Sequence, residues 1–135
     1  MKYRMVISAI LIVLFGVNAH AQMSFCFKSS ENKNLKIKFT VIDKDWKYGC
    51  VQYDKQEYAI FVKLKYDTVL HEYSDHPSLI KYVWEEIVDD SVTGIYQFNL
   101  QGASFDNIYY TRKKDKKRFK FESTGVGLKD CDCDW

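Results

Sequence analysis

Apolar and polar residues alternate along most of this chain, and no other feature of the sequence restricts its fold as strongly. In residues 35–41 every second residue is apolar, and the residues between them are lysine or threonine. A period of two places one set of side chains on each face of a β-strand. No apolar set at helical spacing is long enough to compete, so the sequence predicts an all-β protein.

Polar turns divide this pattern into seven or eight strands. We expect strands at 24–28, 35–41, 47–53, 58–66, 80–88, 92–100, 103–111 and 118–122. Residues 67–79 hold the only proline and are expected to form a short strand followed by a loop. Residues 80–88 are long enough for a helix, but their aromatic and β-branched side chains favour a strand.

Strands that follow one another through short turns form an antiparallel meander. A chain of 135 residues is close to the usual size of one domain. A sheet this small protects its edges either by closing into a barrel or by stacking as a sandwich. We predict a single small antiparallel meander barrel, with the sandwich as the alternative, and expect one all-β domain over residues 22–135.

The first 21 residues are typical of an export signal. Lys2 and Arg4 precede an apolar run, and Ala19 and Ala21 stand where a signal peptidase requires small residues. We expect cleavage before Gln22 and a periplasmic or secreted protein without a transmembrane anchor. Removing residues 1–21 leaves 18 basic and 18 acidic residues, and this neutral balance argues against nucleic-acid binding.

All four cysteines lie after the expected cleavage site, in an oxidising compartment, which favours structural disulfides. In a meander the first and third strands are not neighbours, so a bond between Cys26 and Cys50 would have to cross a strand. We therefore predict that Cys26 and Cys50 each pair with one of the tail residues Cys131 and Cys133. Metal binding by the tail, where cysteines and aspartates alternate, is the alternative.

A basic segment between the last two expected strands is the best candidate contact surface. Seven of the nine residues in 112–120 are lysine or arginine, and two tyrosines come just before them. The predicted binding residues are Tyr109, Tyr110, Arg112, Lys113, Lys114, Lys116 and Lys117. Such a segment can bind an anionic surface, although it can also act only as a charged hairpin tip that keeps a sheet edge soluble.

The remaining polar clusters do not predict catalysis. His71 and His76 are five residues apart and a proline follows, which does not fit two zinc ligands on one helical face. Glu85 and Glu86 are neighbours in an expected strand and so face opposite sides, as a polar strand end. Residues 124–127 lack the pattern of a phosphate loop and are expected to be a hinge. We expect neither a cofactor nor a metal ion.

The stretch from Phe25 to Leu64 resembles the periplasmic inhibitors of c-type lysozyme. The resemblance rests on 25–27 (Phe-Cys-Phe), the strand 35–41, 51–53 (Val-Gln-Tyr) and 60–62 (Ile-Phe-Val). That family places a Ser-Gly-rich inhibitory loop after these strands, whereas residues 66–79 contain no glycine, so no inhibitory residue is transferred. The layout is also similar to that of small exported immunity proteins, and both resemblances imply that the protein binds another protein.

Export, a stapled β-scaffold, many aromatic residues and the lack of a catalytic set favour a non-enzymatic binding protein. We expect an inhibitor or immunity protein that acts on a cell-envelope-directed enzyme or toxin with an acidic surface. Two alternatives stay open: a carrier that holds a small ligand in the barrel mouth, and a hydrolase that uses His71 or His76.

Overall fold

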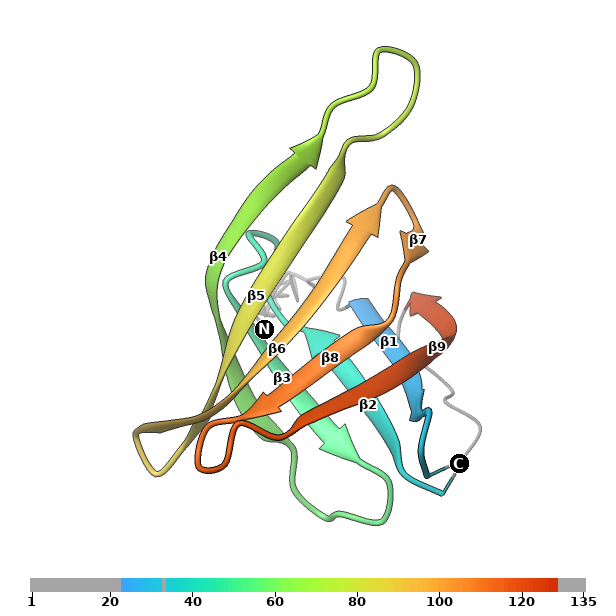
Figure 1. Cartoon of the computed structure of the whole chain (residues 1–135). Coiled ribbons are helices and arrows are strands. Elements are labelled where there is room, and N and C mark those ends of the chain that lie inside the picture. The colour runs from blue at the N-terminus through green and yellow to red at the C-terminus, as the bar shows by residue number, and fades with distance from the viewer. Residues whose placement is uncertain (1–22, 33, 129–135) are drawn as a thin grey trace, which may run out of the picture.

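The computed structural model describes residues 23–32 and 34–128, and all its regular elements are antiparallel strands (Figure 1). The strands are β1 (Met23–Ser29), β2 (Lys36–Val41), β3 (Tyr48–Tyr53), β4 (Ile60–His71), β5 (Leu79–Val88), β6 (Ser91–Gln101), β7 (Ser104–Phe105), β8 (Ile108–Arg112) and β9 (Arg118–Leu128). No helix in these two ranges is long and apolar enough to cross a membrane. The expected export signal and the tail cysteines lie outside the described residues.

Eight of these strands close into a barrel. The order around it is β5-β4-β3-β2-β1-β9-β8-β6, and β6 pairs again with β5. The short strand β7 pairs only with the end of β6. The predicted meander barrel is therefore confirmed and the sandwich is excluded. Residues 80–88 form a strand, as their side chains indicated.

The alternation of the sequence determines which side chains fill the barrel. In β2, Ile37, Phe39 and Val41 point inward and are almost fully buried. The core is unusually aromatic, and the rings of Phe39 and Trp84 meet edge to face with centroids 5.2 Å apart. The core residues are Phe25, Phe27, Ile37, Phe39, Val41, Val51, Val62, Trp84, Tyr96, Phe98, Ile108, Tyr110 and Phe121.

The turn between β5 and β6 fixes one end of the barrel. Its two central residues, Asp89 and Asp90, have φ angles of 50° and 61°. Positive φ at both positions is the requirement of the two-residue hairpin turn whose twist matches that of the strands, and aspartate tolerates it well. The polar turn expected between residues 80–88 and 92–100 is thus confirmed.

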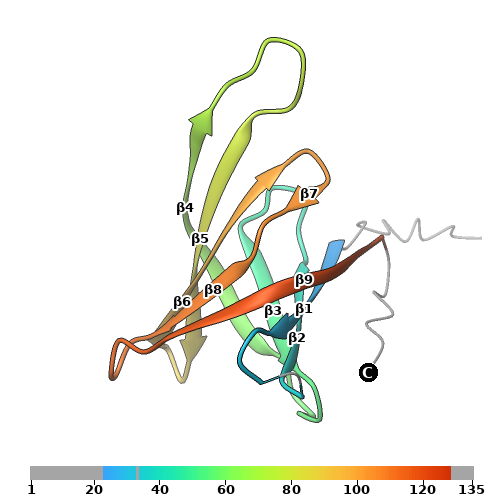
Figure 2. The same ribbon diagram turned by 45° about the vertical axis from the view of Figure 1, so that its right-hand side comes forward.

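Two elements run further than the sequence indicated. Residues 124–127 are not a hinge, because β9 continues to Leu128 and pairs with β1, where Gly127 lies opposite Ser24. Similarly, β4 continues to His71 instead of ending near residue 66. Beyond Lys63 it has left β3 and pairs with β5, so these two strands form an arm that rises past the other strands (Figures 1 and 2).

The cysteines agree with the prediction only in part. Cys50 is a free thiol, so its predicted bond to the tail is wrong, and the two described cysteines are not joined to each other. The reason lies in the strand order: β9, which leads into the tail, neighbours β1, whereas β1 and β2 separate it from β3. Pairing of Cys26 with Cys131 or Cys133 stays a prediction.

Candidate binding site at the turn between β8 and β9

The basic turn, residues 112–117, is held in one conformation by an internal ion pair. The guanidinium of Arg112 donates to both carboxylate oxygens of Asp115, from Nε at 3.0 Å and from Nη2 at 2.6 Å. The Lys117 backbone N–H also donates to Asp115 Oδ1. The Arg112 hydrogen bonds lower the pKa of Asp115 below its usual range. Arg112 is thus partly neutralised by its own turn, and the lysines carry the free positive charge.

The basic turn is also tied to the neighbouring hairpin. The Lys113 backbone N–H donates to the Thr93 carbonyl oxygen at 2.9 Å, and the Arg112 N–H donates to the Lys117 oxygen at 2.9 Å. Lys117 Nζ lies 5.1 Å from the centre of the Phe119 ring, a cation–π contact. The turns β5–β6 and β8–β9 therefore lie side by side, as Figures 1 and 2 show.

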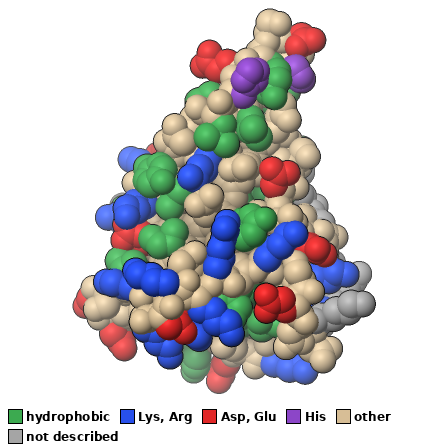
Figure 3. Space-filling model, viewed as in Figure 1, with side chains coloured by type: hydrophobic (Ala, Val, Ile, Leu, Met, Phe, Trp, Pro, Cys, Tyr) green, Lys and Arg blue, Asp and Glu red, His purple; other side chains and the backbone are tan. Residues whose placement is uncertain are grey.

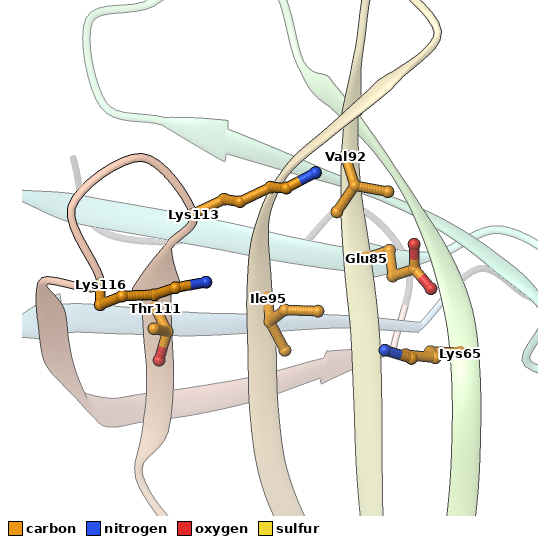
Figure 4. A pocket seen from close by; sticks show the side chains of 7 residues that line it. All are labelled: Lys65, Glu85, Val92, Ile95, Thr111, Lys113 and Lys116. Atoms are coloured by element: carbon orange, nitrogen blue, oxygen red, sulfur yellow. The ribbon is translucent and has the colours of Figure 1, made fainter.

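Three lysines converge over a groove on the outside of the barrel, which we call the outer groove. Its volume is about 370 Å³, and it is lined by Lys65, Glu85, Val92, Ile95, Thr111, Lys113 and Lys116. Figure 4 shows the side chains of Lys113 and Lys116 reaching from the basic turn toward β6, and Lys65 reaching from β4 toward Glu85. Three ammonium groups face one carboxylate over an apolar floor, so the outer groove favours an anionic group on an apolar stem.

The two predicted tyrosines have different roles. Tyr109 faces outward on the same side of β8 as Thr111, beside the outer groove, and the Arg118 guanidinium carbon lies 4.0 Å from the centre of its ring. Tyr110 points inward and is only 8% exposed. Tyr109 therefore stays in the predicted contact surface, whereas Tyr110 is buried and the prediction that includes it is corrected.

Tyr110 instead belongs to a hydrogen-bond network around Glu86 inside the barrel. The Glu86 carboxylate accepts from Thr93 Oγ1 at 2.7 Å and from the Tyr110 hydroxyl at 2.8 Å, both at Oε1. Its Oε2 accepts from the Tyr96 hydroxyl at 2.8 Å. The Tyr53 and Tyr96 hydroxyls are 2.7 Å apart. Four strands, β3, β5, β6 and β8, are thus connected through one carboxylate.

Glu86 also lines a second depression, which we call the inner cleft. It opens at the end of the barrel beside the basic turn and has a volume of about 580 Å³. Its lining is Glu86, Val88, Val92, Thr93, Tyr110, Arg112, Lys113 and Lys114. The basic turn therefore separates two hollows, with Lys113 lining both.

The tyrosine hydroxyls of this network make stability sensitive to alkaline pH. Burial raises the pKa of Tyr53 to about 12, and burial also raises that of Tyr96 and of Tyr110. A raised pKa means that folding favours the neutral phenol. The contribution is complete below pH 10 and is lost as the pH rises toward the folded-state pKa.

We expect Tyr53 alone to remove about 1 kcal/mol from the free energy of unfolding between pH 9 and pH 11. Urea unfolding at a series of pH values measures this, with Tyr53→Phe expected to show a shallower decline. Tyr58→Phe, at an exposed position, serves as the control and should follow the wild type. Parallel curves for Tyr53→Phe and the wild type would contradict the burial of this phenol.

The remaining predicted residues lie apart from this site. His71 and His76 sit at the end of the β4–β5 arm, where each ring contacts the tilted ring of Tyr73 with centroids 4.2 Å apart. Figure 3 shows the histidines at the tip, above the barrel that carries the lysines and arginines of this face. Glu85 and Glu86 do face opposite sides, but Glu86 is buried and is not a polar strand end.

Sequence reasoning missed Glu86 and Lys65. Glu86 was detectable, because it shares a strand face with Tyr82 and Trp84 and so falls on the apolar side of the alternation. Lys65 was not, because the register between β4 and β5 shifts at this residue and the shift depends on pairing across strands.

Comparison with known proteins adds no relative: the chain matches no protein-family model, no curated protein and no solved structure.

Proposed function

We propose that this protein is an exported, non-enzymatic inhibitor or immunity protein that binds an acidic surface of a cell-envelope-directed enzyme or toxin. Export rests on the signal-like residues 1–21. The resemblance of residues 25–64 to periplasmic lysozyme inhibitors supports the same class. The observation that carries the proposal is the outer groove, in which three lysines surround an apolar floor next to an outward tyrosine.

The outer groove and the neighbouring Tyr109 together supply the two parts of a protein-binding surface. Its lysines attract and orient an acidic partner, which mainly raises the association rate. Tyr109, rigid and amphipathic beneath Arg118, supplies the aromatic anchor that slows dissociation. A carboxylate side chain of the partner would place its charge between Lys113 and Lys116 and its methylene groups on Val92 and Ile95.

A rigid surface favours this function because little entropy is lost on binding. The Arg112–Asp115 pair and the Lys113–Thr93 hydrogen bond fix the turn before a partner arrives. Preorganisation of this kind increases affinity without additional contacts. The closed barrel behind the turn provides the scaffold.

A capture experiment tests the proposal. The mature protein is immobilised and exposed to secreted and periplasmic proteins of neighbouring cells, in parallel with the variant in which Lys113, Lys114, Lys116 and Lys117 are changed together to Gln. The wild type should retain an enzyme or toxin and suppress its activity, and the variant should not. The control changes four lysines away from the groove: Lys28, Lys44, Lys47 and Lys55.

The anchor has its own expected effect. Tyr109→Ala should speed dissociation of the captured protein about 30-fold, because an aromatic anchor contributes about 2 kcal/mol. Tyr58→Ala, a change at a tyrosine that is 76% exposed and lies outside the groove, should leave the dissociation rate unchanged. Equal retention by the wild type and the four-lysine variant, or an unaltered rate for Tyr109→Ala, would contradict the proposal.

A further inference from the structure

The charge of Glu86 has no cationic partner in the described residues. Their ion pairs join His76 to Asp75 and Arg112 to Asp115. The three groups that donate to Glu86 are neutral hydroxyls, and its side chain is only 5% exposed. A carboxylate held in this way is well hydrogen-bonded, but no cation among the described residues forms an ion pair with it.

The hydroxyl groups around Glu86 form a chain of hydrogen bonds that ends at its carboxylate. The Tyr96 hydroxyl has one hydrogen, which it donates to Glu86, so at the 2.7 Å contact Tyr53 is the donor and Tyr96 the acceptor. The chain of hydroxyls thus points its hydrogens toward the carboxylate.

The carboxylate still has capacity for one more donor. Oε1 accepts two hydrogen bonds and Oε2 accepts one, and each carboxylate oxygen has two lone pairs. Because Glu86 lines the inner cleft, a donor that enters the cleft can reach it. A protonated amine would donate to the carboxylate and bring a positive charge next to it.

The other parts of the inner cleft determine what such an amine is attached to. Val88 and Val92 form apolar walls, and the exposed lysines Lys113 and Lys114 lie on the rim. A ligand with only an amine would meet the positive charge of these lysines, whereas one that also carries an anionic group would pair with them. We propose that the inner cleft binds a small zwitterion, with its protonated amine at Glu86 and its carboxylate at Lys113 and Lys114.

This inference goes beyond the proposed function, because it concerns a small molecule and the opposite side of the basic turn. Loss of zwitterion binding leaves the outer groove intact, and a failed capture experiment leaves the inner cleft intact. The two sites share only Lys113 and Val92.

Titration of the full exported chain with simple probes tests the proposal that the inner cleft binds a zwitterion. The probes are ω-amino acids from β-alanine to 6-aminohexanoate, each compared with the amine and the carboxylate of equal chain length, by calorimetry and by NMR shifts. One or more of the ω-amino acids should bind about tenfold or more tightly than either matched probe, because both ends then contribute a charged hydrogen bond. Equal binding of the matched amine or carboxylate would overturn the proposal, as would no binding of any ω-amino acid.

Two variants locate the ends of the ligand. Glu86→Gln should weaken ω-amino acid binding about tenfold or more, whereas Glu57→Gln, at an exposed glutamate that lines neither hollow, should have no effect. Lys114→Gln should weaken binding of the ω-amino acid but not of the matched amine. Unaltered affinity in a folded Glu86→Gln protein would overturn the assignment, and the probe series on the wild type decides the case even if that variant does not fold.

Discussion

Gly94→Ala is expected to lower the free energy of unfolding by about 3 kcal/mol, because the new methyl group collides with Tyr110 and overpacking of a core costs this much. A Cβ atom at position 94 would collide with Cε2 and with the hydroxyl oxygen of Tyr110. The ring has little freedom to move, since it is held by the hydrogen bond to Glu86 and packs on Tyr96 with centroids 4.6 Å apart. Urea unfolding followed by circular dichroism measures the loss.

A double-mutant cycle assigns the effect to that one contact. Tyr110→Ala alone removes a buried ring and a donor to Glu86, and it should cost about 3–5 kcal/mol. Adding Gly94→Ala to it should cost little more, because the atoms that the methyl group would meet are gone. If Gly94→Ala lowers the free energy of unfolding equally in the wild type and in Tyr110→Ala, the claim that Tyr110 crowds position 94 is wrong.

Trp84→Ala is expected to lower the free energy of unfolding by about 4 kcal/mol, through the cavity it leaves in the middle of the barrel. Trp84 is fully buried and meets Phe39 edge to face. Its indole Nε1 is buried and has no hydrogen-bond acceptor in the part of the chain that the structure describes. Trp84→Phe removes that unsatisfied donor while keeping an aromatic ring, so it should cost less than half as much as Trp84→Ala.

Chemical denaturation of the two tryptophan variants beside the wild type provides the measurement. A loss for Trp84→Phe as large as that for Trp84→Ala would show that the indole nitrogen has an acceptor, and a negligible loss for Trp84→Ala would place Trp84 outside the core.

Local patterns predicted most of the fold because each strand reveals its own two faces. The alternation in residues 35–41 and the aspartate turn at 89–90 are both reproduced. Barrel closure followed from the need of a small meander to protect its edges. The β4–β5 arm could not be predicted in this way. The continuation of β4 to His71 depends on pairing with β5 and leaves apolar residues such as Val69 half exposed.

The candidate site was predictable in position but not in detail. The basic turn was evident from charge alone, yet the sequence could not decide which of Tyr109 and Tyr110 faces outward. The inner cleft was overlooked because Glu86 was grouped with Glu85 as a polar strand end, when its place on the apolar face indicated burial. That Cys50 is a free thiol could not be predicted, because it follows from the strand order, which separates β3 from β9.

The salt dependence of partner association tests the central claim most directly. With the captured enzyme or toxin, the association rate of the wild type should fall steeply as ionic strength rises, because exposed lysines steer an acidic partner through a field that salt screens. The Gln variant at Lys113, Lys114, Lys116 and Lys117 should associate about tenfold more slowly at low salt and respond little to added salt, with a nearly unchanged melting temperature. His71→Ala and His76→Ala should behave as the wild type. A protein whose association depends on the histidines and ignores these lysines would contradict the account.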